Sequence, residues 1–444
     1  MRTQMEKKGS MEILDIPNEW NLLRIKDVIE KIGSGVTPKG GSEVYVDKGI
    51  TFLRSQNVYD DGLRIDEVSF ITEATHKKMK NSQLRPYDIL INITGASIGR
   101  TCIVPPSIEQ ANINQHILYL RVKKRKVDFI SYYLKSQFIK DYIMSVQSGT
   151  SKEGLSMGQM LKIPLPLPKR TEQTQIADYL DEKIGAIDKK ISLLESKVEK
   201  YRKLRKSLVN ETITRGLNPN VNFKTCGIEW MKKIPEHWDV KRIKELGEIS
   251  TSSVNKKTEK DERLVKIVNY TDVYENPNRE LFNNKEYMIV SAKENQIQQK
   301  KLKKGDVLFT PSSETIEDIG VSSVVMEDLT NTLYSYHILR LRFSKKLDNS
   351  YKKYMLNNDF VQSYFSRESK GTTRKILGLN AFYNLLVVVP PTLNEQKEIA
   401  DYLDKKTQHI DAIVNSIDKQ ITKLAELRKT LINDVVTGKI KVTV

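Results

Sequence analysis

The chain has few cysteines, few histidines and no long apolar run, and each shortage argues against a class of protein. With only Cys102 and Cys226, a disulfide framework is not expected, and a reducing cytoplasm is the predicted setting. The longest purely aliphatic stretch, residues 385–389, has the length of a strand, whereas a membrane-spanning helix needs about 20 apolar residues. Residues 1–10 include basic side chains but no apolar segment, so neither a secretory signal nor a membrane partner is predicted.

Motifs for catalysis and for cofactors are also missing. The glycines of residues 35–40 are followed by Gly41 and Ser42, where a phosphate-binding P-loop needs Lys and Ser or Thr. The nearest approach to an adenine methyltransferase motif, residues 276–278 (NPN), is typical of a turn. The five histidines and two cysteines do not gather at metal-ligand spacing. The sequence therefore predicts no enzyme activity, no catalytic residue, no metal site and no cofactor for this chain.

Positive charge, in contrast, is abundant. Lys and Arg number 73 against 56 Asp and Glu, which gives a formal net charge of +17. A hydrophobic fraction of 39% suits a globular protein with a core of its own. Such an excess of positive charge indicates a polyanionic partner, first a nucleic acid and second an acidic membrane surface. Basic charge without an anionic partner is the remaining alternative.

The chain contains the same pattern twice. Residues 172–181 (EQTQIADYLD) and 395–404 (EQKEIADYLD) agree at eight of ten positions with an offset of 223. Residues 16–28 (IPNEWNLLRIKDV) return as residues 234–246 (IPEHWDVKRIKEL) with an offset of 218. A period of this length is too long for a solenoid repeat and indicates a duplicated domain with its connector. Between the repeated strings the loops differ, which is typical of a scaffold that carries variable recognition surfaces.

Each repeated EQxxIADYLD string is predicted to begin a long helix. Apolar residues follow it at alternating spacings of three and four, which is the pattern of a coiled-coil seam. Thr171 and Asn394 are expected to cap the helix starts, and Gly216 and Gly438 are expected to end the helices. About 40 residues correspond to about 60 Å of helix. Two such helices in one chain would bury their seams by pairing with each other in antiparallel fashion.

Several repeated residues are predicted to have structural roles. Arg205 and Arg428 fall on the seam, where we expect them to extend out to solvent rather than to fix the register. Asp-x-Lys strings at 181–183 and 404–406 are interpreted as solvated helix faces and not as remnants of a nuclease site. The matched histidines, His116 and His337, are interpreted as packed, hydrogen-bonded framework residues, and Trp20 and Trp238 are interpreted as structural anchors where each domain begins.

The predicted fold class is α+β, with two mixed α/β recognition domains joined by two long helices in a pseudo-twofold arrangement. The helices are expected to pair as an antiparallel coiled coil. The predicted boundaries are an N-terminal extension at 1–15, a first recognition domain at 16–168, a first spacer helix region at 169–217, a linker at 218–233, a second recognition domain at 234–390, a second spacer helix region at 391–440 and a tail at 441–444.

Four signatures occur in order in both copies and together resemble a known family. They are an IPxxW-x3-RIK string, a strand that opens with Asp and an aliphatic run, a Gly-Thr turn, and a proline-rich exit into EQxxIADYLD. In the two copies the first three are carried by Trp20 and Trp238, Asp88 and Asp306, and Gly149 and Gly371. With this doubled set over nearly its whole length, the chain resembles the specificity subunit of a type I restriction-modification system.

The resemblance implies a DNA-binding protein without catalysis of its own. Each recognition domain would read one half of a bipartite site in double-stranded DNA, and the helices would fix the gap between the halves. The helices would also bind two adenine methyltransferase subunits, and restriction and translocase subunits would join the assembly. S-adenosylmethionine, ATP and Mg²⁺ would then belong to those partner subunits. The alternatives are a coiled-coil scaffold with incidental basic charge and a self-contained enzyme that cuts or modifies DNA.

The candidate DNA-binding residues lie in loops that differ between the two copies and are basic or polar, although a solvated loop charge is an equal alternative for each alone. They are Ser34, Thr37, Lys39, Thr94, Ser97, Arg100, Thr150 and Lys152 in the first copy, and Lys256, Lys257, Ser312, Ser313, Thr373, Arg374 and Lys375 in the second. The candidate partner-binding residues lie on the helices: Ile187, Ile191, Leu194, Ile410, Val414 and Ile417.

Overall fold

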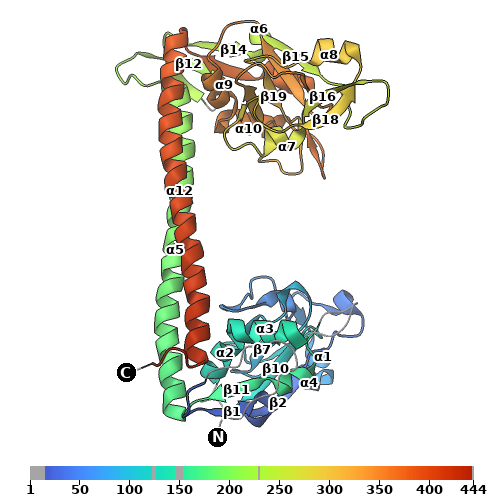
Figure 1. Ribbon diagram of the computed structural model, residues 1–444, viewed down its shortest axis with the longest axis vertical. Coiled ribbons are helices and arrows are strands. Elements are labelled where there is room, and N and C mark those ends of the chain that lie inside the picture. The colour runs from blue at the N-terminus through green and yellow to red at the C-terminus, as the bar shows by residue number, and fades with distance from the viewer. Residues whose placement is uncertain (1–15, 123–126, 147–153, 229–230, 443–444) are drawn as a thin grey trace. The chain divides into compact units, whose positions relative to one another are not determined.

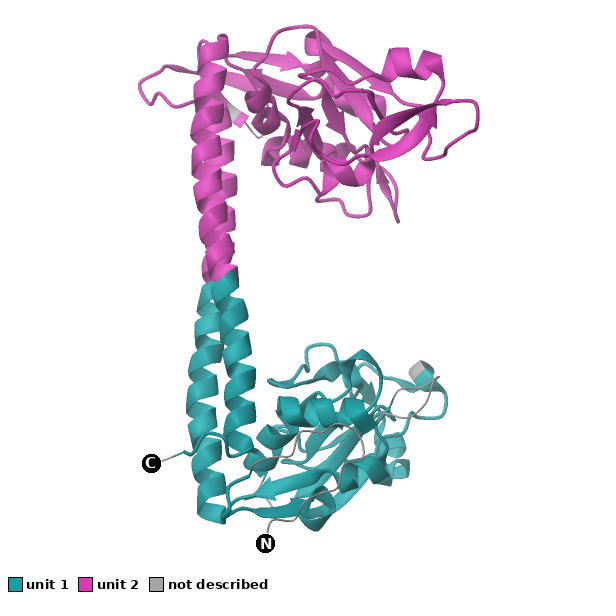
Figure 2. Cartoon of the chain, viewed as in Figure 1, with its two compact units in different colours: residues 1–195, 419–444 teal, residues 196–418 magenta. Residues whose placement is uncertain are grey.

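The computed structural model describes residues 16–122, 127–146, 154–228 and 231–442 (Figure 1). The chain divides into two compact units, which we describe separately (Figure 2). The first unit contains residues 1–195 and 419–444, and the second contains residues 196–418. In the described part of the chain, no helix is both long and apolar enough to cross a membrane.

Two small sheets form the recognition domain of the first unit. One sheet has the antiparallel order β2 (Ile29–Ser34), β10 (Ile117–Val122), β7 (Ile89–Asn92) and β8 (Thr101–Ile103). The other has the order β6 (Ser69–Ile71), β3 (Ile50–Leu53) and β9 (Ala111–Ile113), in which β3 and β9 are parallel. Two further strand pairs are β1 (Asn21–Arg24) with β11 (Pro164–Leu167) and β4 (Val58–Tyr59) with β5 (Gly62–Leu63). The helices are α1 (Glu73–Lys78), α2 (Val127–Lys135), α3 (Gln137–Val146) and α4 (Met157–Lys162).

The second unit repeats this framework. Its larger sheet has the order β15 (Gly247–Thr251), β23 (Leu339–Phe343), β19 (Val307–Phe309), β21 (Ser322–Val325) and β17 (Glu280–Leu281). Its smaller sheet has the order β18 (Met288–Ala292), β16 (Arg263–Val268) and β22 (Thr332–Tyr334), in which β16 and β22 are parallel. Further strand pairs are β14 (Asp239–Arg242) with β25 (Leu386–Val389), β12 (Phe223–Ile228) with β13 (Met231–Pro235), and β20 (Ser312–Ser313) with β24 (Lys375–Ile376). The helices are α6 (Ile243–Leu246), α7 (Tyr270–Tyr274), α8 (Glu294–Lys300), α9 (Asn349–Leu356), α10 (Asp359–Glu368) and α11 (Leu379–Asn384).

Two long helices, α5 (Arg170–Arg215) and α12 (Leu393–Val436), contribute to both units. In the first unit, Ile184 from the early part of α5 and Ile432 from the late part of α12 belong to the same apolar core. In the second unit, Val209 from late α5 and Leu403 from early α12 share a core in the same way. Within each unit the two helix segments are therefore antiparallel, and the predicted fold class is confirmed.

The two long helices end at the predicted glycines, but their N-terminal caps are not the predicted residues. Gly216 and Gly438 have φ angles of +71° and +80°, the left-handed conformation that ends a helix readily at glycine. The predicted caps are wrong, because Thr171 and Asn394 lie inside the first helical turn. The hydroxyl of Thr392 accepts from the backbone N–H of Glu395 at 3.2 Å, so in α12 the capping oxygen lies two residues earlier than predicted.

Candidate nucleic-acid interface

The larger sheet of the first unit brings the predicted recognition loops to one edge. Ser34 at the end of β2 pairs with Leu118, and Asn92 at the end of β7 pairs with Ile117 at the start of β10. Because β10 lies between two strands of opposite direction, the chain leaves β2 and β7 at the edge where it enters β10. The loops that carry Thr37 and Thr94 therefore begin side by side.

Polar side chains from these loops form a connected chain of hydrogen bonds. The hydroxyl of Thr37 donates to the amide oxygen of Gln115. The Nε2 atoms of Gln115 and His116 lie 3.2 Å apart, and His116 Nδ1 lies 2.6 Å from the Thr94 hydroxyl. His116 is half-buried at this edge, and both of its ring nitrogens have hydrogen-bond partners, which agrees with its interpretation as a hydrogen-bonded framework residue.

Arg100 is held by an aromatic ring. Its guanidinium carbon lies 4.6 Å from the centroid of the Tyr59 ring, and that of Arg64 lies 4.8 Å from the same centroid. Arg64 also pairs with Asp61 at 2.6 Å, whereas among the described residues no carboxylate pairs with Arg100. Stacking on an aromatic face orients a guanidinium while its N–H groups stay free to donate. Tyr59 and Arg64 were not predicted, because nothing in the sequence places residues 59 and 100 together.

The remaining predicted residues of the first unit differ in availability. Lys39 is exposed, whereas the hydroxyl of Ser97 accepts from the Asn92 side chain at 3.1 Å. Thr150 and Lys152 lie outside the described residues. Gly154, which follows them, forms an isolated bridge with Thr94 and so brings the chain back to the same edge.

The larger sheet of the second unit repeats this edge. Thr251 at the end of β15 and Phe309 at the end of β19 both pair with Leu339 at the start of β23. The short pair of β20 with β24 then places Ser313 opposite Lys375. Loops that are far apart in sequence thus meet at one place, as the duplicated framework requires.

Basic side chains surround His337 at this edge. Burial, then Arg374 and then Lys256 lower the pKa of His337 below its usual value of 6.5, so the two cations lie near the imidazole. The ring of Tyr336, which is 48% exposed, lies 3.9 Å from the ring of His337 between centroids. A histidine with a lowered pKa, an exposed tyrosine and two cations for which the described residues provide no ion-pair partner together form a surface suited to phosphates and base edges.

The other predicted residues of the second unit are mostly exposed. Lys257 and Thr373 are exposed, and Ser312 is half-buried. The ammonium of Lys375 donates to the carbonyl of Gly371 at 2.7 Å, and the Ser313 hydroxyl accepts from the backbone N–H of Thr315 at 3.2 Å. The structure therefore brings Ser312 and Ser313 together with Lys375 but engages Ser313 and Lys375 in bonds inside the loop cluster.

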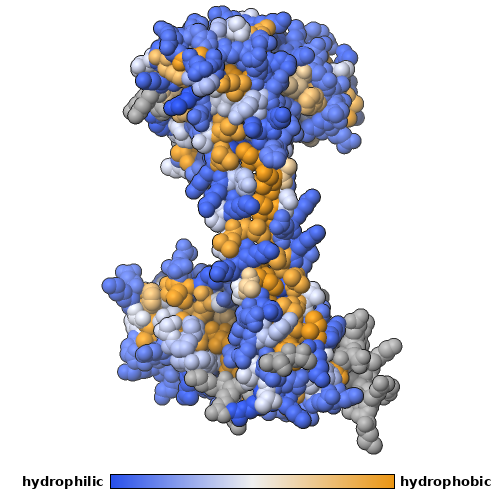
Figure 3. Space-filling model, turned by 90° about the vertical axis from the view of Figure 1, so that its left-hand side faces the viewer, coloured by the Kyte–Doolittle hydropathy of each residue, from blue (hydrophilic) through white to orange (hydrophobic). Residues whose placement is uncertain are grey.

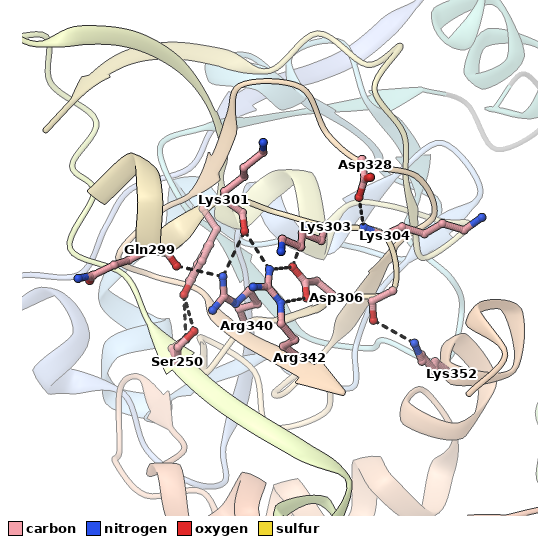
Figure 4. A network of polar contacts seen from close by, with 12 residues as sticks. Ser250, Gln299, Lys301, Lys303, Lys304, Asp306, Asp328, Arg340, Arg342 and Lys352 are labelled. Atoms are coloured by element: carbon pink, nitrogen blue, oxygen red, sulfur yellow. Dashed lines mark hydrogen bonds and ion pairs between the residues drawn. The ribbon is translucent and has the colours of Figure 1, made fainter. Parts of the chain in front are cut away.

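The Asp of each strand signature has a structural role. Asp88, 1% exposed, accepts from Arg121 through both carboxylate oxygens, at 2.8 and 2.6 Å. Asp306 accepts from Arg342 in the same way and at the same distances (Figure 4). The paired carboxylate raises the pKa of each arginine. These bidentate pairs fix neighbouring strands at the edge opposite to the recognition loops.

A buried arginine accompanies the ion pair of the second unit. Arg340 is 8% exposed and donates to the carbonyl oxygens of Gln299 and Lys301, each at 3.2 Å (Figure 4). Its position corresponds to Tyr119 in the first unit, so the two frameworks differ even inside the sheet.

Each repeated EQxxIADYLD string attaches a recognition domain to its helix. The indole N–H of Trp20 donates to Glu172 at 3.0 Å, and that of Trp238 donates to Glu395 at 2.8 Å. The neighbouring Gln side chains donate to the carbonyls of Pro168 and Pro390 at 2.8 and 2.9 Å. The tryptophans are thus structural anchors, in agreement with the sequence.

The last Asp of each string completes this attachment. The hydroxyl of Tyr132 donates to Asp181 at 2.5 Å, and that of Tyr354 donates to Asp404 at 2.6 Å. Asp181 is exposed, in agreement with its interpretation as part of a solvated helix face, whereas Asp404 is half-buried; each also accepts a hydrogen bond from the domain beside it. We call the two sets the domain–helix joints: Trp20, Tyr132, Glu172, Gln173 and Asp181 in the first unit, and Trp238, Tyr354, Glu395, Gln396 and Asp404 in the second.

The seam arginines form ion pairs between the helices. Arg205 Nε lies 3.0 Å from Asp411 in the second unit, and Arg428 Nε lies 2.9 Å from Asp188 in the first. Both partners recur at an offset of 223, so the two pairs are equivalent. The prediction that the arginines extend out to solvent is wrong. They link the two helices within each unit.

The comparison with known protein families agrees with these repeats. A profile described as type I restriction modification DNA specificity domain matches residues 17–196 and 235–423. The two matches cover most of the chain and correspond to its two copies. The chain belongs to this family. The predicted membership is therefore confirmed, and with it the interpretation as a DNA-specificity subunit rather than an enzyme.

Relatives of the family are similar over nearly the whole chain. The MjaVIII specificity subunit of Methanocaldococcus jannaschii is 24% identical and covers 98% of this chain and 96% of its own length. The EcoKI specificity subunit of Escherichia coli is 20% identical, with 96% and 90% covered. A chain from a solved type I restriction-modification assembly has a TM-score of 0.71 at 16% identity, covering 96% of this chain and 100% of its own. The HsdS subunit of Thermoanaerobacter tengcongensis has a TM-score of 0.53 at 16% identity, with 96% and 98% covered, and both likenesses concern the fold.

Within this family assignment, the predicted partner-binding residues differ in exposure. Ile410 and Ile417 are 6% and 4% exposed, so the helix pair already buries them. Four are partly exposed along the helices: Ile187, Ile191, Leu194 and Val414. Among the described residues, no group of three or more His, Cys, Asp or Glu side chains could hold a metal ion.

Proposed function

We propose that each recognition domain reads one half of a bipartite DNA site through the loop cluster at its sheet edge. The observation that carries this proposal is one framework with two different polar surfaces. In the first unit the edge presents Arg100 on Tyr59 and the bonded pair of His116 and Thr94. In the second it presents Tyr336 and His337 with Arg374 nearby. Two domains with the same backbone framework and different side chains at the sheet edge are suited to reading two different half-sites.

The chemistry of these edges matches the two kinds of contact that DNA offers. Exposed cations such as Lys39 and Lys256 bind phosphates, which gives affinity that falls with salt but carries no sequence information. An oriented guanidinium such as that of Arg100 can donate two hydrogen bonds to guanine in the major groove. Amide and imidazole groups of Gln115 and His116 can read further base edges.

The paired helices would set the gap between the half-sites and bind two adenine methyltransferase subunits. Restriction and translocase subunits would join the larger complex. S-adenosylmethionine, ATP and Mg²⁺ would act in those partners, and the methyltransferase would flip its target adenine out of the duplex while this chain holds the DNA in register. The complex would work in the cytoplasm, where the DNA is.

The decisive experiment is sequencing of methylated adenines in DNA modified by the reconstituted complex. We expect one motif with two specified halves separated by a fixed, unspecified gap. Replacing residues 16–168 by the recognition domain of another family member should change one half and leave the other half and the gap unchanged. A complex that binds its partners but shows no sequence preference would instead favour the coiled-coil scaffold, and turnover by the isolated chain would favour an enzyme.

A further inference from the structure

The duplication allows the two helices to be compared position by position. Several residues that are identical in both helices have a contact inside their own unit that accounts for the identity, as the joints and the ion pairs show. Leu204 and Leu427 have no such contact among the described residues. They occupy equivalent positions, and each is 52% exposed. A single exposed leucine is ordinary on a protein surface, but its repetition at equivalent positions of both copies favours a shared function.

Each exposed leucine continues from the core of its own unit. Leu208, one turn after Leu204, packs partly buried against the core of the second unit. Leu431, one turn after Leu427, packs in the same way against the core of the first. Residues four apart lie on one helix face, so each pair forms an apolar strip that runs from a recognition domain onto the helix surface. On the face drawn in Figure 3, apolar side chains do reach the surface along the helices.

A lysine lies one turn before each exposed leucine. Lys200 and Lys423 occupy equivalent positions and are exposed. In the described part of the chain, neither has an ion-pair partner. An exposed leucine and an exposed lysine thus occur at the same spacing in both helices. A protein that binds both side chains would have an apolar pocket for the leucine and a carboxylate beside it for the lysine.

Agreement between the copies varies at the neighbouring exposed positions. Arg202 and Lys203 correspond to Ala425 and Glu426, so size and charge sign differ there, whereas Lys206 and Lys429 are identical and exposed. A general demand for solubility explains a repeated lysine but not a repeated leucine at an exposed position. A repeated partner explains the leucine, because it requires the same anchor in both places.

We propose that Leu204 and Leu427, each with its lysine, bind two copies of one protein partner. This rests on the proposed function, which requires two methyltransferase subunits and so identifies the partner as that subunit. DNA is a poor occupant, because its backbone offers anionic phosphates to the lysines but no apolar pocket to the leucines. A second copy of this chain is the other occupant that the experiment must exclude.

The test uses the full chain and measures how many methyltransferase subunits of the same system it binds, by sedimentation with increasing subunit concentration. The wild-type chain should bind two. L204E and L427E should each weaken one of the two sites by at least about tenfold, and the double variant should weaken both. L264E is the matched control, because Leu264 is a 56% exposed leucine in a sheet of the second unit, and it should bind two subunits as the wild type does.

Several results would contradict the proposal. Undiminished binding of two subunits by the double variant would overturn it, as would equal weakening by L264E. Self-association of the chain alone that the double variant abolishes would assign the leucines to a second copy of this chain. If the glutamates unfold the chain, the milder pair K200E and K423E tests the same surface and should weaken binding too. A wild-type chain that binds no methyltransferase would overturn the proposed function itself.

Discussion

Lys352 is a buried charge at a position where the first unit has an apolar residue. It is 4% exposed and donates to the Gly305 carbonyl at 3.1 Å and to the Asn349 side chain at 2.8 Å. Burial lowers its pKa to about 8, although Asp306 and Asp348 act in the opposite direction. Lys352 lies two residues before Tyr354, and the residue two before the equivalent Tyr132 is Ile130. Ile130 is therefore the counterpart of Lys352 in the first unit.

We predict that Lys352→Ile stabilises the chain at pH 7 by about 1–3 kcal/mol. The usual lysine pKa of 10.5 applies in the unfolded chain, so between pH 8 and 10.5 the unfolded state holds more protons. Stability of the wild type therefore rises with pH across this window, and the advantage of the variant should shrink there. Calorimetric unfolding at pH 7 and pH 10 checks this. Exposed Lys346→Ile should show neither the gain nor the pH dependence.

His337 offers a second measurement at the scale of one residue. Removing a neighbouring cation with Arg374→Gln should raise the pKa of the imidazole towards 6.5, because that charge disfavours protonation. A histidine NMR titration measures this shift directly. The titration of His337 in the wild-type chain provides the reference. An unchanged His337 titration would mean that the Arg374 charge does not reach the imidazole.

At the scale of elements, the sequence predicts the long helices but not the residues of the chain that their side chains contact. The apolar seam and the final glycines are local patterns, so helix existence and the C-terminal ends were correct. Asp188 and Arg428 are 240 residues apart, and only the register of two packed helices brings them together. The same limit applies to Tyr59 beneath Arg100 and to the aspartates of the joints. Recognition loops were found as variable segments, whereas their internal bonds depend on backbone conformations that no local pattern specifies.

The ion pair of Arg205 with Asp411 predicts a rescue by charge exchange. Arg205→Asp should place two carboxylates together and destabilise the helix pair of the second unit by about 1 kcal/mol, because the side chains are 37% and 49% exposed and solvent weakens the interaction. Adding Asp411→Arg should restore most of that loss. A double-mutant cycle from denaturant unfolding measures the coupling. Reversal of the exposed pair Arg202 with Glu199, within one helix, is the control and should not depend on α12.

The scale of the whole molecule concerns the gap between half-sites. Four residues inserted after Glu195 and four after Asp418 fall at the boundary between the two units, so the ion pairs of each unit stay intact. Because each insertion lengthens its helix by about 6 Å, we expect the gap in the methylated motif to grow by about one to two base pairs with both half-sites unchanged. Four residues inserted after Asn218, beyond the end of α5, should leave the gap as it is. An unchanged gap in the variant with both helices lengthened would refute the proposal that the helices set the gap.

The joints have a consequence for how such a protein fails. Each recognition domain is held by its own tryptophan, glutamine and tyrosine to the helix segment of its own unit. Damage at one joint would therefore loosen one domain and leave the other in place. Under the proposed function, the result is a protein that still recognises half of its target, and a half-site occurs far more often in a genome than the whole. For a partner that marks or cuts DNA, a single broken joint would then be more dangerous to the cell than the loss of the entire chain.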